Sequence, residues 1–473
     1  MVARCRRSQL GFELVARRRR SQLGRAGSRG PARHTEPTSR DAKGKLIMAE
    51  FTAEVFQNEF LPDGGTDVNA IVTLTCSGAG SAGQTGSGDA GEIIIVDTSG
   101  SMGRVKLDAA KVAAAAAVDQ IFDGTWFAVI AGTHQAYLAF PLVRMGTGMV
   151  RMDSNARQAA HQAISQFRSD GGTAMGTWLT LAGRLFDSVP ELVQRHAILL
   201  TDGENHNETP EQLTNAIMGV TGKFQCDCRG VGVDWQVAEV RRIAQALLGS
   251  VDIIPEPDQM SQVFAELMQQ SMSRGVADAQ LRVWAPQGAQ VQFVRQVSPT
   301  VEDLTSRRVE VNALTGGYPT GSWGDESRDY HVSVRLAAKA LGQEQLAARV
   351  QLAVANQVVA QGMVKAMWSD DEGLTTRINP EVAHYTGQTE LAEAIQDGLA
   401  AKSAGDEETA TMKLGRAVQL AAETGNEEAT TRLRKVVDIE NSETGTVRLK
   451  RAVDKADEMA LDTASTKTTR IRG

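Results

Sequence analysis

Continuous apolar runs alternate with helix-period patterns along residues 92–275. The runs at 92–97 and 196–202 are apolar almost throughout, whereas the stretch at 106–122 repeats apolar residues three and four positions apart. Strands that are apolar throughout are buried on both faces, which is typical of a mostly parallel sheet covered by helices on each side. The pattern therefore predicts an α/β fold, and function in such a sheet lies at the carboxyl ends of its strands.

A different pattern, with apolar residues at every second position, occupies residues 276–370 and also residues 48–76. Alternation of this kind predicts strands with one buried face, and a succession of them is typical of an antiparallel β-sandwich. Because two strands alone are barely stable, we expect those of 48–76 to complete the sandwich. The α/β segment is then an insertion, entered through a Gly/Ser-rich linker at 77–91 that lacks the Lys of a phosphate-binding loop.

Helix-period patterns return in residues 371–450. Two similar segments begin at Gly405 and Gly425, and in each the glycine is followed by Asp or Asn and then by two glutamates. A glycine that ends one helix, a capping Asp or Asn and an acidic first turn together mark the start of the next helix. We therefore expect a C-terminal helical hairpin, followed by a tail at 451–473 that is disordered after residue 460.

The charge of the chain is unevenly distributed. The 473 residues carry a formal net charge of −7, yet residues 1–47 contain thirteen Arg or Lys and only three Asp or Glu. A basic arm can attract nucleic acid, but strand-like patterning begins only at Met48. We interpret 1–47 as a disordered basic extension that results from a start codon assigned too far upstream. With this interpretation of 1–47, we expect no nucleic acid as a partner. No apolar run is long enough to span a membrane, so we expect no membrane as a partner either.

Two of the four cysteines, Cys226 and Cys228, lie two positions apart in a strand-like run. Both side chains then point the same way, as in half of a zinc site. No second Cys or His pair at a suitable spacing completes such a site. Reduced core thiols are the better interpretation, and they indicate a cytoplasmic protein.

Five oxygen-bearing side chains lie where strand or helix patterns stop, and we expect them to meet at one edge of the sheet. Mg²⁺ prefers oxygen ligands and keeps several waters. Three hydroxyls and two carboxylates supply oxygens and leave a position for a carboxylate of a partner. Mn²⁺ or Ca²⁺ would also fit. The predicted metal-binding residues are Asp97, Ser99, Ser101, Thr173 and Asp202.

The order of these motifs resembles that of von Willebrand factor type A (VWA) domains. DTSGS contains Asp97, Ser99 and Ser101, GGTAMG contains Thr173, and LLTDG contains Asp202, so that all five positions match the family's metal-ion-dependent adhesion site. The resemblance implies a Rossmann-like sheet with helices on both faces and Mg²⁺-dependent protein binding. The flanking sandwich and helices resemble those of bacterial VWA proteins, and the excess of Arg over Lys is typical of a high-GC bacterial genome.

An enzymatic alternative starts from the same aspartate. Phosphotransferases of the haloacid dehalogenase type carry Asp-x-Asp after a strand, but Ser99 stands at the second carboxylate position, which removes the usual general acid. The loop 204–207 beside Asp202 could supply a base or a ligand to a metal-dependent hydrolase, and a solvated rim that contacts the partner is the alternative for this loop. We expect no enzymatic activity.

A signalling alternative concerns the hydroxyls of the C-terminal tail. A Ser/Thr kinase could phosphorylate them for capture by a phosphothreonine-binding domain, whereas a merely solvated tail is the simpler interpretation. The main expectation is a cytoplasmic interaction protein that binds an Asp or Glu of a partner through Mg²⁺. The tail residues concerned are Thr463, Ser465, Thr466, Thr468 and Thr469.

Overall fold

The computed structural model describes residues 49–82, 89–142 and 148–470. The basic extension expected at 1–47 and the middle of the linker expected at 77–91 lie outside the described residues. Within the described ranges, none of the helices combines the length and the apolar character that a membrane crossing requires.

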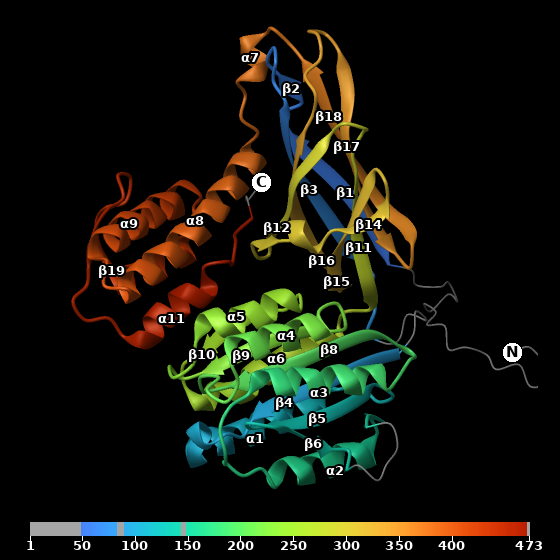
Figure 1. The fold of residues 1–473 in the computed structure, drawn as a ribbon, viewed down its shortest axis with the longest axis vertical. Helices are drawn as coiled ribbons and strands as arrows, with labels where there is room; N and C mark the ends of the chain where they lie inside the picture. Colours follow the sequence, from blue (N-terminus) through green and yellow to red (C-terminus); the bar gives the residue numbers. More distant parts are fainter. Residues whose placement is uncertain (1–48, 83–88, 143–147, 471–473) are drawn as a thin grey trace, which may run out of the picture. The chain divides into compact units, whose positions relative to one another are not determined.

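A seven-stranded sheet is built from the middle of the chain (Figure 1). Its strand order is β10-β9-β8-β4-β5-β6, and β7 also pairs with β5. All neighbouring strands are parallel except β6 and β7, which run antiparallel to β5, so the predicted mostly parallel sheet is confirmed. The strands are β4 (Asp89–Asp97), β5 (Trp126–Gly132), β6 (Ala136–Phe140), β7 (Val150–Arg151), β8 (Leu192–Thr201), β9 (Gln225–Val231) and β10 (Val251–Ile254).

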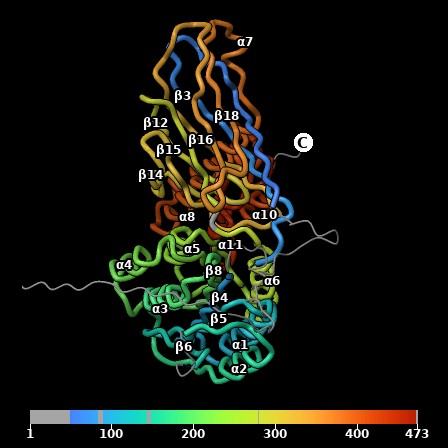
Figure 2. Tube along the Cα trace, turned by 90° about the vertical axis from the view of Figure 1, so that its right-hand side faces the viewer, coloured from blue at the N-terminus to red at the C-terminus, as the bar shows by residue number. Residues whose placement is uncertain are grey.

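Helices cover both faces of this sheet because its central strands are apolar on both sides. In β4, Ile93 and Ile95 belong to the core beneath α3, α4 and α5, whereas Ile94 and Val96 belong to the core beneath α1, α2 and α6. Figure 2 shows β4 and β8 between α3 and α4 on one side and α6 on the other. The helices are α1 (Gly103–Gln120), α2 (Ser154–Ser165), α3 (Met175–Asp187), α4 (Pro210–Val220), α5 (Val237–Ala246) and α6 (Met260–Met272), with short 3-10 helices η1 (Gly100–Met102) and η3 (Pro257–Gln259).

Two further sheets pack against each other as a β-sandwich. Their strand orders are β1-β3-β16-β12-β13 and β14-β15-β11-β17-β18-β2. Strand β3 pairs antiparallel with β16 from Asp67 to Cys76, so the N-terminal strands complete a sandwich whose other strands follow the α/β segment, as predicted. The strands are β1 (Glu50–Gln57), β2 (Phe60–Leu61), β3 (Asp67–Ser77), β11 (Val276–Trp284), β12 (Gln290–Ser298), β13 (Glu302–Asp303), β14 (Val309–Asn312), β15 (Thr315–Trp323), β16 (Glu326–Arg335), β17 (Glu344–Val354) and β18 (Gln357–Trp368), with a 3-10 turn, η4 (Thr305–Arg307).

The C-terminal region begins its helices where the repeated segments predicted. Gly405 and Gly425 adopt positive φ angles of 80° and 64°, and the side chains of Asp406 and Asn426 cap the helices that follow. A hairpin of two helices is nevertheless too simple, because a two-stranded sheet and a last helix complete the core of this region. The elements are α7 (Glu372–Thr375), α8 (Pro380–Ser403), α9 (Glu407–Glu423), α10 (Glu427–Val436), β19 (Val437–Asn441), β20 (Thr446–Leu449) and α11 (Lys455–Ala464).

The expected disorder after residue 460 is wrong for the tail up to residue 470. Helix α11 continues to Ala464, and Thr463 is buried with its hydroxyl bonded to the carbonyl of Met459 at 2.9 Å. Beyond the helix, the Lys467 ammonium lies 2.6 Å from Asp252 and the Thr468 hydroxyl donates to the carbonyl of Val297 at 2.7 Å. A polar composition suggested solvation, but these hydroxyls and charges find partners within the protein.

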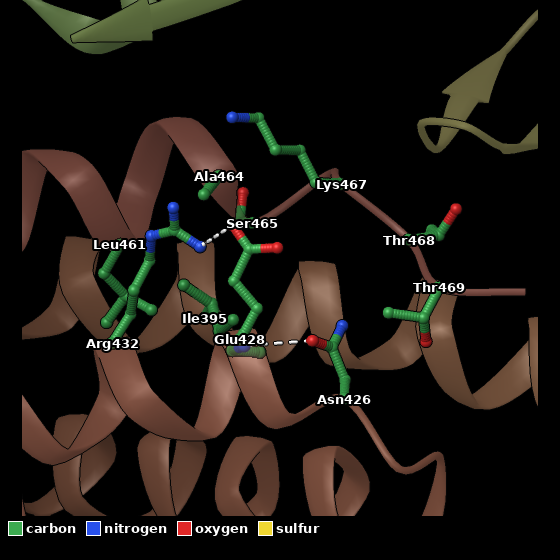
Figure 3. A pocket seen from close by; sticks show the side chains of 11 residues that line it. Ile395, Asn426, Glu428, Arg432, Leu461, Ala464, Ser465, Lys467, Thr468 and Thr469 are labelled. Atoms are coloured by element: carbon green, nitrogen blue, oxygen red, sulfur yellow. Dashed lines mark hydrogen bonds and ion pairs between the residues drawn. The ribbon is translucent and has the colours of Figure 1, made fainter. Parts of the chain in front are cut away.

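The tail also lines a small pocket against α10. Figure 3 shows Thr468 and Thr469 on one side of it, Arg432 on the other, and Ser465 between them. Of the hydroxyls predicted as phosphorylation sites, Thr463 and Ser465 are buried, and those of Thr466, Thr468 and Thr469 belong to half-buried residues. A solvated tail is therefore also a wrong expectation.

Candidate metal-binding site

The carboxyl ends of β4 and β8 carry two of the predicted residues. Asp97 is the last residue of β4, and Asp202 directly follows β8. Register explains why they come together: β4 and β8 are parallel, and Val96 lies opposite Leu200, so both strands end at the same level. A hydrogen bond of 2.7 Å from the Thr201 hydroxyl to Asp97 Oδ2 joins the ends of the two strands.

Two serine hydroxyls lie next to each other above this edge. The Oγ atoms of Ser99 and Ser101 are 2.9 Å apart, and Ser101 Oγ donates to Asp202 Oδ1 at 2.7 Å. The loop between β4 and η1 has this shape because Asp97 Oδ1 accepts the backbone N–H of Ser99 at 2.8 Å. Asp97 therefore organises the loop from behind, and of the two serines Ser99 is buried whereas Ser101 is exposed.

Thr173 reaches the same place from a separate loop. A Cβ atom on Gly203 would lie 2.8 Å from Ser101 Oγ and 3.5 Å from Thr173 Oγ1, so both hydroxyls face this glycine. The two loops are also joined by their backbones, because the Gly100 N–H donates to the carbonyl of Gly171 at 2.8 Å. The structure thus brings all five predicted residues to one edge.

Burial sets the electrostatics of the edge. Asp97 and Asp202 are 0 % exposed. Burial raises the pKa of Asp97 to about 6, against the lowering by hydrogen bonds from Ser99 and Thr201. Two buried carboxylates at one strand edge repel each other and need nearby positive charge.

Lys106, which the sequence analysis missed, supplies part of that charge. Its Nζ lies 2.7 Å from Asp202 Oδ2 and 3.4 Å from Asp234 Oδ2. Burial by itself lowers the pKa of Lys106, but its hydrogen bond and charge interaction with Asp202 outweigh that effect and raise it. Nothing in the periodicity of α1 marks this lysine, because the pairing depends on the loop between β4 and α1.

The loop after Asp202 has a role that the sequence analysis did not assign. Asn207 Oδ1 accepts the N–H of Thr173 at 3.1 Å, and Asn205 Oδ1 accepts the N–H of Met175 at 3.0 Å. Asn207 thus holds the Thr173 loop, and Asn205 satisfies the first N–H of α3, which lacks a partner within the helix. Two asparagines next to Thr-Asp-Gly are the sequence signal that could have indicated this support.

The donor set fits a hard divalent cation. It consists of oxygens only, three hydroxyls and two carboxylates, which are the ligands that Mg²⁺ and Ca²⁺ take in proteins. Within the described residues, no group of three or more His, Cys, Asp or Glu side chains could hold a metal ion. Cys226 and Cys228 are free and fully buried, with their Sγ atoms 3.9 Å apart.

Comparison with protein families assigns the fold. The model of the von Willebrand factor type A domain matches residues 93–204, and that of the von Willebrand factor type A C-terminal domain matches residues 419–465. A solved von Willebrand factor type A protein from Catenulispora acidiphila is 47% identical, with a TM-score of 0.84 over 89% of this chain and 97% of that chain. The chain belongs to the von Willebrand factor type A family. The predicted VWA resemblance is confirmed at the level of family and fold.

Two further comparisons are more distant. The ArnB paralog VWA2 from Sulfolobus acidocaldarius is similar in fold, with a TM-score of 0.54 at 14% identity over 88% of this chain and 98% of that chain. An uncharacterized protein of Synechocystis sp. is 30% identical over 216 residues, which are 45% of this chain. The VWA chain spans about half the length of this curated relative, 49%.

Proposed function

We propose that this VWA protein is a non-enzymatic interaction module that binds an acidic residue of a partner through a divalent cation. VWA domains are commonly protein-interaction modules. The observation that carries the proposal is the convergence of the hydroxyls of Ser99, Ser101 and Thr173 at the edge where Asp97 and Asp202 are buried.

The chain's own residues divide the work. Ser99, Ser101 and Thr173 present neutral oxygens, Asp97 fixes the loop that carries the serines, and Asp202 holds Ser101. A bound Mg²⁺, Mn²⁺ or Ca²⁺ would supply a coordination position for the partner's carboxylate. The supporting asparagines keep the Thr173 loop in place before a cation binds, which reduces the entropy lost on binding.

The experiment is calorimetric titration with MgCl₂, followed by capture of partners from lysate of the native host with Mg²⁺ or with EDTA. The test variant is Ser101→Ala/Thr173→Ala, and the control Ser165→Ala/Thr214→Ala removes two exposed hydroxyls on α2 and α4. We expect Mg²⁺ binding and EDTA-sensitive capture in the wild type and the control, and neither in the test variant. Identical captured proteins in all conditions would refute the proposal.

Absence of enzymatic activity and cytoplasmic location in a bacterium are parts of the same proposal. A broad phosphatase and esterase screen with Mg²⁺ or Mn²⁺ tests the first, and turnover that the test variant loses would contradict it. Free, buried Cys76, Cys226 and Cys228 support a reducing compartment.

Phosphorylation of the tail stays a separate prediction, and at Thr463 or Ser465 a kinase requires the tail to leave its buried position.

A further inference from the structure

The ammonium of Lys106 lies against Asp202, one of the two buried carboxylates of the candidate metal-binding site. Two carboxylates balance the charge of a divalent cation and leave no net attraction for a further anion. Lys106 adds a positive charge beside Asp202, and its second partner, Asp234, has a side chain that is 68% exposed, so solvent screens that carboxylate. Counted over its buried groups alone, the loaded site therefore carries a net positive charge. We infer that Lys106 makes this site selective for anionic ligands and, in doing so, weakens its hold on the cation; the inference rests on the proposed function.

The position of Lys106 is set by the same loop that sets the hydroxyls. Ser101 lies in η1, and α1 begins at Gly103, so Lys106 lies in the early part of the helix that directly follows. The two oxygens of Asp202 have different partners: Oδ1 accepts from Ser101 and Oδ2 from Lys106. A cation beside Ser101 would therefore share Asp202 with the ammonium.

The ammonium is held in place from a second direction. Asp234 Oδ2 lies 3.4 Å from Lys106 Nζ, and its side chain is 68% exposed. A Cβ on Gly232 would lie 3.7 Å from the same Nζ, so the end of β9 runs beside the lysine. With only 24% of its side chain exposed, Lys106 interacts with Asp202 in a medium that screens charge less than water does.

This arrangement has consequences of opposite sign. Repulsion between the ammonium and the cation lowers the affinity for Mg²⁺, whereas attraction between the ammonium and a carboxylate raises the affinity for the partner's acidic group. If Lys106 only packed against the loop, its loss would weaken both kinds of binding. Opposite shifts are the signature of the electrostatic role.

The test compares Lys106→Met, which keeps an apolar stem but removes the charge, with Lys106→Arg, which keeps the charge. Mg²⁺ affinity is measured by calorimetry with the metal alone. Acetate is the carboxylate probe, and its binding at saturating Mn²⁺ is measured by paramagnetic relaxation of its methyl protons. We expect Lys106→Met to bind Mg²⁺ about threefold to tenfold more tightly and acetate more weakly by a similar factor, with Lys106→Arg close to the wild type.

A second variant makes the test independent of how well Lys106→Met folds. Asp234→Asn removes the other carboxylate that holds Lys106 and leaves Asp202 intact, so we expect weaker Mg²⁺ binding and tighter acetate binding. Shifts of both affinities in one direction, or none, would overturn the inference alone. If neither the wild type nor Lys106→Met binds Mg²⁺ or Mn²⁺, the proposed function fails with it.

Discussion

Two clusters of buried charge lie on the same strands of the VWA sheet, one within the strands and one at their carboxyl ends. Within the strands, His196 Nδ1 lies 2.7 Å from Glu92 and Nε2 lies 3.0 Å from Asp227. At the ends, Asp97 and Asp202 are surrounded by hydroxyls and by one partly exposed lysine. The first cluster is closed, because both imidazole nitrogens are used by the protein. The second offers oxygens to a ligand.

One strand register produces both clusters. Glu92 lies opposite His196 in the pairing of β4 with β8, and the same offset brings Asp97 to the level of Thr201, to which it is hydrogen-bonded. Ser271 Oγ donates to Glu92 at 2.6 Å, and the Ser250 N–H donates to Asp227 at 2.7 Å. In the closed cluster the chain thus supplies every partner of its buried charge, whereas in the open cluster it leaves oxygens for the proposed cation.

The largest loss of stability should come from replacing the histidine of the closed cluster. In His196→Gln, an amide replaces the imidazole between two buried carboxylates, and we expect the free energy of unfolding to fall by about 3–5 kcal/mol. Urea denaturation measures it, and His161→Gln, which removes a half-exposed histidine paired with Asp119, is the control. A loss below about 1 kcal/mol would mean that the cluster is not an ionic one.

The pH dependence of stability should also belong to the closed cluster. Burial by itself lowers the pKa of His196, but Glu92 and Asp227 outweigh it and raise the pKa from 6.5 to about 9. The folded state therefore keeps a proton that the unfolded state loses above pH 6.5, so this stabilisation is complete below that pH and falls as pH rises toward 9. Denaturation at several pH values should show that the free energy of unfolding falls by on the order of 3 kcal/mol as pH rises from 6.5 toward 9, and that this fall is absent in His196→Gln. An equal decline in this variant would assign it to other groups.

The open cluster should respond to metal instead. If Mg²⁺ binds only the folded protein, at one hundred times its dissociation constant it adds about 2.7 kcal/mol to the free energy of unfolding. We expect Ser101→Ala/Thr173→Ala to lose this increment and His196→Gln, where still folded, to keep it. Thermal denaturation with Mg²⁺ and with EDTA measures both. Loss of the response in His196→Gln alone would show that the two clusters are coupled through their strands.

The sequence predicted the open cluster better than the closed one for a physical reason. Strand ends are visible where an apolar run stops, so Asp97 and Asp202 could be placed at one edge from the pattern alone. Glu92 and His196 lie within or at the start of such runs, and their pairing depends on the register between two strands far apart in the chain. Lys106 was missed for a related reason, because the direction of a helical side chain depends on the loop that precedes it.

The prediction for the tail was wrong because it rested on composition alone. Its polar composition indicated disorder, yet the Arg241 side chain donates to Asp462 at 2.7 Å and Lys467 pairs with Asp252 at 2.6 Å. Composition reports how much apolar area a segment can bury, but not whether its charges meet opposite charges elsewhere. The helices of 371–450 were predicted more successfully because glycine and capping residues act locally.

The smallest effect should come from an ion pair that is neither closed nor part of the open cluster. Lys467 and Asp252 have side chains that are 40% and 31% exposed, so solvent screens their attraction, and Lys467→Ala should cost at most about 1 kcal/mol in urea denaturation. Lys455→Ala, which shortens an α11 residue with no such pair to Asp252, serves as the control for loss of a lysine. Salt separates this pair from the His196 cluster: in 1 M NaCl the difference between Lys467→Ala and wild type should vanish, while that between His196→Gln and wild type should persist. If Lys467→Ala instead lost much more free energy of unfolding, and the loss persisted in 1 M NaCl, Asp252 would belong with the buried charges of the sheet. The contrast between the exposed pair and the closed cluster would then fail.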